Sequence, residues 1–254
     1  MDRLANKIAY VTGSAGGIGA ASVRRFAQEG ATVIMADING EANEQLSSEL
    51  KSQGFNVTTV RVDSRDEADV KKSFDKAVSS RGRLDILFNC AGGSTSNDGP
   101  VDKISNDFLE ETLRLEVVTV ASCSRAALPY LRAAGGGCII NMSSFVAFRS
   151  AVEIHAYIAG KGAIKSLTSA MARSYAKDNI RVNAIAPGVA LSERARRRID
   201  EINSKSDLTF SWSDYPFATG SPIDIANVAV FLASDESRMI NGQTIRADGG
   251  LSVY

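Results

Sequence analysis

Residues 8–19 of the chain read IAYVTGSAGGIG, in which an apolar run leads directly into a glycine-rich turn. The run Lys7–Val11 is predicted to be a buried strand, and Ile18–Gln28 has the spacing of an amphipathic helix. Glycines between a strand and a helix permit a tight turn and a close approach to the backbone. The helix then presents free N–H groups and the positive end of its dipole, which suit a pyrophosphate.

The remainder of the chain repeats this alternation of short β-branched runs with longer amphipathic stretches. Further strands are predicted at Thr32–Ala36, Asn56–Val62, Leu84–Asn89, Cys138–Met142, Arg181–Ala184 and Gln243–Ala247. Further helices are predicted at Asp66–Ser80, Asp107–Leu131, His155–Lys177 and Asp224–Ser234. Strands that alternate with helices form a parallel sheet with helices on both faces. We therefore expect one α/β domain over residues 1–254, with a Rossmann-like, doubly wound parallel sheet of about seven strands.

One long stretch, residues 188–221, shows neither pattern. It is polar and contains Trp212, the only tryptophan of the chain. An irregular segment of this length in a compact domain usually serves a function, often as a lid. We expect residues 188–221 to form a loop or lid over a substrate site.

Composition excludes several classes of function. Lysine plus arginine equals aspartate plus glutamate at 29 each, so no net charge favours binding to nucleic acid or to an anionic membrane. No run approaches the roughly 18 apolar residues that a membrane span needs. The three cysteines, Cys90, Cys123 and Cys138, lack the spacing of a metal site and are expected to be buried and reduced. A cytoplasmic protein without a metal is the expectation.

An acidic residue, Asp37, ends the second predicted strand, eighteen residues after Gly19. A carboxylate at this place accepts hydrogen bonds from ribose hydroxyls and repels a 2′-phosphate. The neighbouring Ala15 and Ile38 offer no positive charge that would attract such a phosphate. The cofactor is therefore expected to be NAD rather than NADP, unless Asp37 only caps the following helix.

A tyrosine and a lysine four positions apart, Tyr157 and Lys161, lie in the predicted helix His155–Lys177 and share one of its faces. A free phenol has a pKa of about 10, which is too high for proton exchange at neutral pH. A neighbouring ammonium favours the phenolate and brings this pKa toward the working range. Ser144 follows the predicted strand Cys138–Met142 and precedes Tyr157 by thirteen residues. These three side chains are candidates for catalysis.

Taken together and in this order, these elements resemble the short-chain dehydrogenase/reductase family over essentially the whole chain. The matching elements are Thr12–Gly19, Asn89–Gly92, Ser144, Tyr157 with Lys161, and Asn183 followed by Pro187 and Gly188. The resemblance implies an oxidoreductase that transfers a hydride between NAD and a small-molecule secondary alcohol or ketone.

The resemblance also implies roles for single residues. Tyr157 would be the acid and base, Lys161 would lower its pKa and hold the nicotinamide ribose, and Ser144 would hydrogen-bond the reacting oxygen. Asp63 would approach the adenine, Asn89 would help to hold the sheet beside the cofactor, and Val189 would meet the carboxamide. The full set of implied cofactor contacts is Gly13, Ser14, Gly17, Ile18, Gly19, Asp37, Asp63, Asn89, Ala91, Gly92, Tyr157, Lys161, Pro187, Gly188, Val189 and Ser192.

One departure from the family pattern bears on catalysis. The family usually has an asparagine thirteen residues before the proline that is Pro129 here, and this chain has Glu116 at that position. The asparagine holds a water in the proton relay. Glu116, which we include among the catalytic candidates, would either hold that water or perturb Tyr157 and Lys161 by its charge. Three milder departures are Cys90, Gly160 and Ser192, where asparagine, serine and threonine are usual.

Two other functions remain open at this stage. Glu116 leaves room for a cofactor-binding protein with little turnover, although the complete set of Ser144, Tyr157 and Lys161 favours an enzyme. A ketoacyl reductase that uses NADPH is a further alternative, which Asp37 disfavours. The arginines Arg194, Arg196, Arg197 and Arg198 would suit an anionic substrate, but the nearby acids Glu193, Asp200 and Glu201 favour a solvated surface.

We expect a homotetramer, built as a dimer of dimers. The predicted helices Asp107–Leu131 and His155–Lys177 carry apolar residues on more than one face, including Ile164, Leu167 and Met171. Only one face of a helix is needed to cover the sheet, so a second subunit is expected to bury the other. The resemblance implies that these two helices form a dimer interface.

Overall fold

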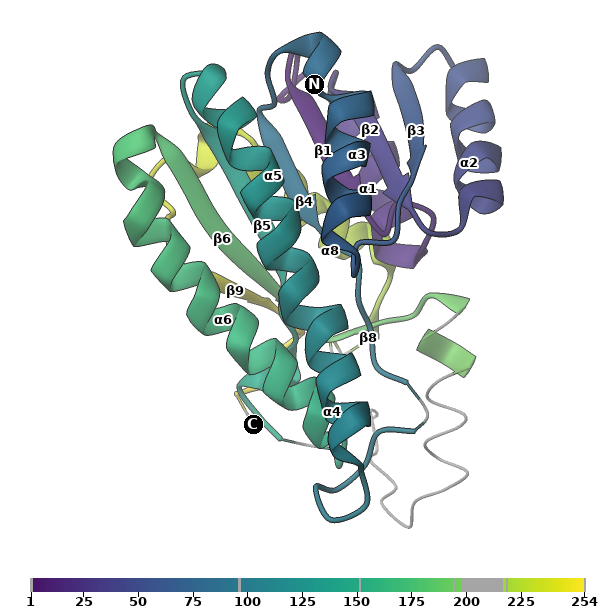
Figure 1. The fold of residues 1–254 in the computed structure, drawn as a ribbon, viewed down its shortest axis with the longest axis vertical. Helices are drawn as coiled ribbons and strands as arrows, with labels where there is room; N and C mark the ends of the chain where they lie inside the picture. The colour runs from purple at the N-terminus through teal and green to yellow at the C-terminus, as the bar shows by residue number, and fades with distance from the viewer. Residues whose placement is uncertain are drawn as a thin grey trace.

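A seven-stranded parallel sheet forms the centre of the protein, with the strand order β3-β2-β1-β4-β5-β6-β9 (Figure 1). The computed structural model describes residues 2–95, 97–150, 152–193, 195–197, 217 and 219–253. The strands of this sheet are β1 (Ile8–Thr12), β2 (Thr32–Asp37), β3 (Val57–Arg61), β4 (Ile86–Asn89), β5 (Gly137–Met142), β6 (Ile180–Pro187) and β9 (Thr244–Ala247). The short strands β7 (Val189–Ala190) and β8 (Thr219–Gly220) pair separately.

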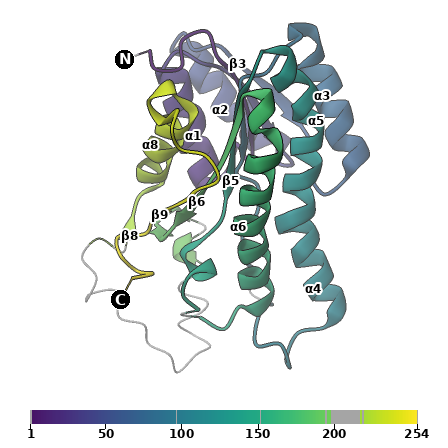
Figure 2. The same ribbon diagram turned by 90° about the vertical axis from the view of Figure 1, so that its left-hand side faces the viewer.

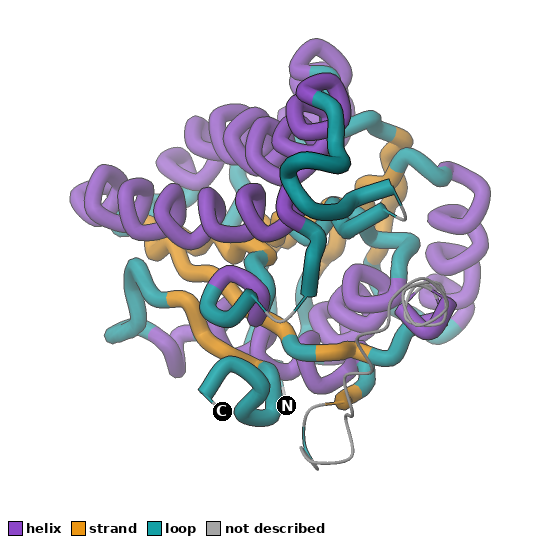
Figure 3. The backbone as a smooth tube through the Cα atoms, turned by 90° about the horizontal axis from the view of Figure 1, so that it is seen from below, coloured by secondary structure: helices purple, strands orange, loops and turns teal. Residues whose placement is uncertain are grey.

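Helices cover both faces of the sheet (Figures 2 and 3). One face packs against α1 (Gly17–Gln28), α2 (Gly40–Ser52) and α8 (Pro222–Ala233). The other face packs against α3 (Glu67–Ala77), α5 (Thr119–Ala133) and α6 (His155–Tyr175). The helix α4 (Asn106–Leu113) precedes α5 and contacts α6.

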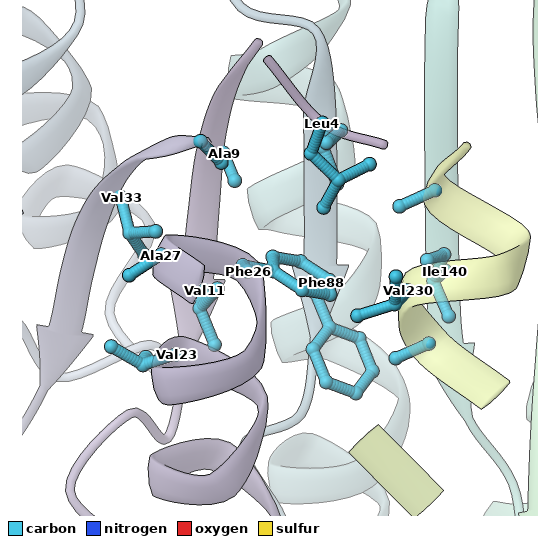
Figure 4. Packing of buried hydrophobic residues seen from close by; sticks show 14 of the residues in the cluster. Leu4, Ala9, Val11, Val23, Phe26, Ala27, Val33, Phe88, Ile140 and Val230 are labelled. Carbon is cyan, nitrogen blue, oxygen red and sulfur yellow. The ribbon is translucent and has the colours of Figure 1, made fainter. Parts of the chain in front are cut away.

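The central strand β1 shows why the sheet is covered twice. Ala9 and Val11 point to the side of α1 and α8, where they are buried in one cluster with Phe26 and Val230 (Figure 4). Tyr10, between them in sequence, points to the opposite side, where its ring stacks on Phe74 of α3 at 4.3 Å between centroids. Successive side chains of a strand alternate between faces, so a run that is apolar throughout requires helices on both.

The strand order reverses between β1 and β4, and this place sets the position of the site. The hydroxyl of Thr12, at the end of β1, accepts hydrogen bonds from the N–H groups of Cys90 and Ala91, both at 3.0 Å, just after β4. The carboxyl ends of the two strands are thereby held together. In open parallel sheets, ligands bind in the crevice at such a reversal.

The predicted doubly wound sheet of seven strands is confirmed, whereas one predicted helix is wrong in its form. Residues 107–131 do not form one α-helix, because a π-helical segment, Arg114–Val118, lies between α4 and α5. The hydroxyl of Thr119 donates to the carbonyl of Leu115 at 2.6 Å beside this widened turn. The helix α2 was not among the helices predicted from the sequence.

Candidate active site

A cleft of about 390 Å³ opens where β1, β4, β5 and β6 end. Most of the residues that the sequence analysis singled out line it together. They are Gly13, Gly17, Ile18, Gly19, Ala91, Gly92, Ser144, Tyr157, Lys161, Pro187, Gly188, Val189 and Ser192. Three catalytic candidates from two different segments thus meet the glycine-rich turn in one cavity.

Five predicted residues do not line this cleft. Ser14 is fully buried and its hydroxyl donates to Asn43 Oδ1 at 2.8 Å. Asn89 is buried in the sheet, where its Nδ2 donates to Asn141 Oδ1 at 2.9 Å. The carboxylate of Asp63 forms an ion pair with Arg65 at 2.7 Å. The other two, Asp37 and Glu116, are treated below.

The glycines of the first turn form a cradle that a side chain would fill. Gly13 has a φ of +66°, in the region that favours glycine. A β-carbon on Gly19 would lie 1.9 Å from the carbonyl oxygen of Gly13, and one on Gly17 would lie 2.5 Å from Ser192 Cβ. No side chain caps α1, and its first turn contains no acidic residue. The turn therefore fits the pyrophosphate of a dinucleotide, which the N–H groups at the start of α1 would hold.

Asp37 connects the end of β2 to this turn. One carboxylate oxygen accepts a hydrogen bond from the N–H of Ala15 at 2.9 Å, and the other accepts one from the N–H of Asn39 at 2.8 Å. The cap of α2 is Asn39, whose side chain accepts from the N–H of Ala42 at 3.1 Å, so Asp37 does not cap that helix. Each carboxylate oxygen keeps a further lone pair for a ribose hydroxyl.

Lys161 and Glu116 form a buried ion pair at the base of the cleft. Lys161 Nζ lies 2.6 Å from Glu116 Oε2, with side-chain exposures of 5% and 0%. The ammonium also donates to the carbonyl of Met142 at 2.8 Å. The second carboxylate oxygen of Glu116 accepts a hydrogen bond from the N–H of Gly93 at 2.6 Å. Glu116 therefore contacts Lys161 directly.

The charge state of Lys161 follows from these contacts. Burial alone lowers its pKa, but the negative charge of Glu116 and, less strongly, Tyr157 outweigh it, so the pKa of Lys161 is raised above its ordinary value. Lys161 Nζ lies 5.3 Å from the centre of the Tyr157 ring. These contacts therefore favour the charged ammonium of Lys161 beside the phenol of Tyr157.

Ser144 and Tyr157 lie toward the apolar end of the cleft. Ser144 follows β5, and its hydroxyl accepts from the N–H of Val146 at 3.4 Å. The neighbouring Ser143 donates to the carbonyl of Lys161 at 3.0 Å, which ties the end of β5 to α6. The apolar group around Tyr157 consists of Phe145, Val146, Val152, Ile158, Val189 and Leu251.

The sequence analysis missed Asp98, which holds the start of the helix that carries Tyr157. Its carboxylate accepts hydrogen bonds from the N–H groups of Ala156 at 3.1 Å and Tyr157 at 2.9 Å. His155 strengthens this contact, since its N–H donates to the carbonyl of Gly99 and its Nδ1 accepts from the N–H of Val101. Asp98 lies 59 positions before Tyr157, so no local capping pattern indicated it.

The remaining candidates give a mixed result. Most of the predicted lid, residues 188–221, and both Arg194 and Arg198 lie outside the described residues. Arg197 pairs with Glu193 at 2.9 Å on an exposed surface, as the solvated interpretation expects. The cysteines are free, and burial raises the pKa of each thiol, to about 12 for Cys90.

The structure corrects the physical argument for a second subunit. Of the residues expected on an uncovered face, Ile164 and Met171 are buried within the chain. Met171 lies in the apolar cluster between the sheet and its covering helices, and Leu167 packs against that cluster and is partly buried. The expected tetramer thus rests on the family resemblance alone. Among the described residues, no three His, Cys, Asp or Glu side chains are placed to hold a metal ion, and no helix is both long and apolar enough to span a membrane.

Comparison with known proteins places the chain among oxidoreductases. Residues 13–252 match the family model described as enoyl-(acyl carrier protein) reductase. The chain is 33% identical to a 7α-hydroxysteroid dehydrogenase of Bacteroides fragilis, over 100% of this chain and 97% of that protein. It is also 33% identical to a 3-oxoacyl-(acyl-carrier-protein) reductase of Thermotoga maritima, over 99% of this chain and 100% of that protein.

A solved structure shares the fold at the same level of similarity. It is a 7α-hydroxysteroid dehydrogenase in complex with NADH and 7-oxo glycochenodeoxycholic acid, and it is 32% identical to this chain with a TM-score of 0.88. The match covers 98% of this chain and 95% of the other.

Proposed function

The chain belongs to the short-chain dehydrogenase/reductase family of oxidoreductases, and we propose that it uses NAD to interconvert a secondary alcohol and a ketone. The observation that carries this proposal is that Ser144, Tyr157 and Lys161 line one cleft with the glycine cradle. A nicotinamide cofactor, when bound, supplies or accepts the hydride.

The proton chemistry is assigned to Tyr157. Its phenol exchanges a proton with the oxygen of the substrate, which the hydroxyl of Ser144 orients by a hydrogen bond. Lys161 donates a hydrogen bond to the carbonyl of Met142, and its ammonium forms an ion pair with Glu116. An ammonium has three N–H groups, and we assign one of them to the contents of the cleft, which Lys161 lines. The charge of Lys161 favours the phenolate of Tyr157.

The choice of NAD over NADP is supported by Asp37. Its carboxylate lies at the end of β2, bonded to the glycine-rich turn through Ala15. A 2′-phosphate in this place would meet a negative charge, whereas a ribose hydroxyl would meet an acceptor. Because one relative is a 3-oxoacyl reductase, ketoacyl reduction is a second candidate function. We rank it below alcohol oxidation because ketoacyl reduction usually accompanies NADPH.

The substrate is proposed to be an apolar, ring-containing secondary alcohol without a charge near the reacting carbon. Phe145, Val146, Val152 and Ile154 line the cleft beside Tyr157 and offer only hydrocarbon surface. The names of the hydroxysteroid dehydrogenases among the relatives indicate that those proteins act on compounds of this kind.

The test is NADH formation from a panel of hydroxysteroids, cyclic diols, short secondary alcohols, sugars and hydroxy acids. We expect turnover with alicyclic alcohols, faster with NAD than with NADP. The Tyr157→Phe variant serves as the control for contaminating activity. Absence of turnover throughout the panel, together with tight NADH binding, would favour a cofactor-binding protein instead, and a preference for NADP would contradict the argument from Asp37.

A further inference from the structure

The carboxylate of Glu116 is buried between Lys161 and the loop that follows β4. Its side chain is fully buried, and its two oxygens contact Lys161 Nζ and the N–H of Gly93. A β-carbon on Gly92 would lie 2.8 Å from Oε2 and 3.1 Å from Oε1, and Gly92 has a φ of +142°. The loop after β4 thus approaches the carboxylate as closely as a glycine backbone allows. Such a fit indicates a specific site for a carboxylate.

The contact between the Glu116 carboxylate and Lys161 brings two opposite charges together in a buried place. A buried carboxylate without a counter-ion is strongly destabilising, and so is a buried ammonium. The ionisable groups that face the ammonium of Lys161 are Glu116 on the π-helical segment, Tyr157 on α6 and Cys90 after β4. Because burial raises the pKa of the Cys90 thiol to about 12, this group stays neutral. Glu116 is therefore the carboxylate of the cluster that pairs with the ammonium of Lys161.

We propose that Glu116 is a positioning residue that keeps the buried Lys161 charged and fixes its ammonium, so that one N–H group remains directed to the contents of the cleft. A neutral residue at this position would leave the ammonium bonded to the carbonyl of Met142 but without a carboxylate partner. A carboxylate one methylene shorter would keep the charge but would lose contact with Lys161 or with Gly93. The part of this proposal that concerns turnover rests on the function proposed above.

The charge state of Lys161 is measured directly, in an experiment that does not depend on enzymatic turnover. The NMR signal of the lysine ε-carbon is assigned by its absence in Lys161→Met and titrated in the wild type, Glu116→Gln and Glu110→Gln. Glu110 is exposed on the neighbouring helix α4 and serves as the matched control. We expect Lys161 to titrate above the ordinary range of a lysine in the wild type and in Glu110→Gln, and its titration midpoint to fall by at least about one pH unit in Glu116→Gln. An unchanged midpoint in Glu116→Gln would overturn the proposal.

The Glu116→Asp variant tests whether Glu116 positions the ammonium of Lys161. The same variant tests the proposal if Glu116→Gln does not fold. We expect the titration midpoint of Lys161 to stay close to that of the wild type in this variant, because the carboxylate is retained. We expect kcat to fall at least about tenfold, because the ammonium is displaced. Wild-type kcat in Glu116→Asp, or early loss of the Lys161 charge, would overturn the proposal. An inactive wild type whose Lys161 titrates as expected would contradict only the proposed function.

Discussion

A β-carbon added to Gly160 would lie 2.9 Å from the β-carbon of Glu116, so helix α6 and the π-helical segment touch where one side chain is absent. The family pattern has a serine at position 160, and this chain has its glycine opposite its unusual glutamate. The two departures noted in the sequence therefore lie in contact in the fold.

We predict that Gly160→Ala lowers the free energy of unfolding by about 1–3 kcal/mol, because a methyl group is forced into a filled space. The control is Gly162→Ala in the same helix, where an added β-carbon would meet nothing within 4 Å. That substitution is expected to raise the free energy of unfolding by about 0.5–1 kcal/mol, the helix-forming advantage of alanine. Urea unfolding measures both, and equal effects at the two positions would show that the contact with Glu116 is unimportant.

The ion pair of Lys161 and Glu116 is expected to behave non-additively. Lys161→Met leaves a buried carboxylate without its counter-ion, which costs about 3–5 kcal/mol of stability. The double variant Lys161→Met/Glu116→Gln removes both charges and is expected to be more stable than Lys161→Met alone. Unfolding of the wild type, both single variants and the double variant gives the coupling energy. A double variant less stable than either single one would speak against the direct pairing.

Tyr157→Phe is expected to reduce kcat by about 10²–10⁴-fold, because the variant has no proton to exchange. NADH affinity should change little, since the ring that lines the cleft is retained. The matched control is Tyr175→Phe in the last turn of the same helix, which should keep wild-type kcat. Rapid turnover in Tyr157→Phe would move the proton chemistry to another residue.

Cofactor choice is expected to change with Asp37→Asn/Ile38→Arg. Asparagine retains an oxygen that accepts from the Ala15 N–H but no longer repels a phosphate, and Ile38 is about half exposed at 49%, so an arginine there can reach solvent. We expect the ratio of kcat/KM for NADP to that for NAD to rise about 10–100-fold, the value of one charge-assisted hydrogen bond to phosphate. Ile38→Arg alone should give a smaller rise. No change in the ratio would exclude Asp37 as the selecting group.

Acid stability is predicted to depend on Glu29 at the end of α1. Hydrogen bonds from Arg3, with a smaller contribution from Arg25, hold the pKa of Glu29 at about 2, below its ordinary 4.5. A carboxyl whose pKa is depressed by folding stabilises the protein above pH 4.5, and this stabilisation is lost as the pH falls toward 2.

Glu29→Gln should therefore cost about 1–3 kcal/mol at neutral pH, and its difference from the wild type should shrink between pH 4.5 and 2. The control is Glu49→Gln, whose partner Arg24 lies on an exposed surface and which should change stability by about 1 kcal/mol or less. A constant difference across this pH range would mean that Glu29 acts through packing and not through its charge.

The sequence allowed the sheet to be predicted because the strands are apolar on both faces, as Ala9, Tyr10 and Val11 illustrate. Residues that meet in the cleft could be predicted where a motif joined them, as it joined Tyr157 to Lys161. Contacts between distant segments could not be predicted, because no sequence pattern near Asp98 indicates that its carboxylate holds the start of α6. The uncovered face expected at Ile164 was wrong because apolar spacing does not tell which neighbour a helix will meet.

The π-helical segment Arg114–Val118 has a further consequence for any alignment that includes this chain. A widened turn accommodates one residue more than an α-helical turn, so the helical wheel drawn from α4 does not continue into α5. Because the widened turn absorbs the extra residue, a deletion of one residue here would restore regular winding with α4 and α5 in nearly the same orientation. It would also remove the widened turn from which Glu116 contacts Lys161. The number of residues between Glu116 and Pro129 therefore determines which side chain faces Lys161. A sequence alignment that places a gap between these two residues would assign a different residue to this position of the active site.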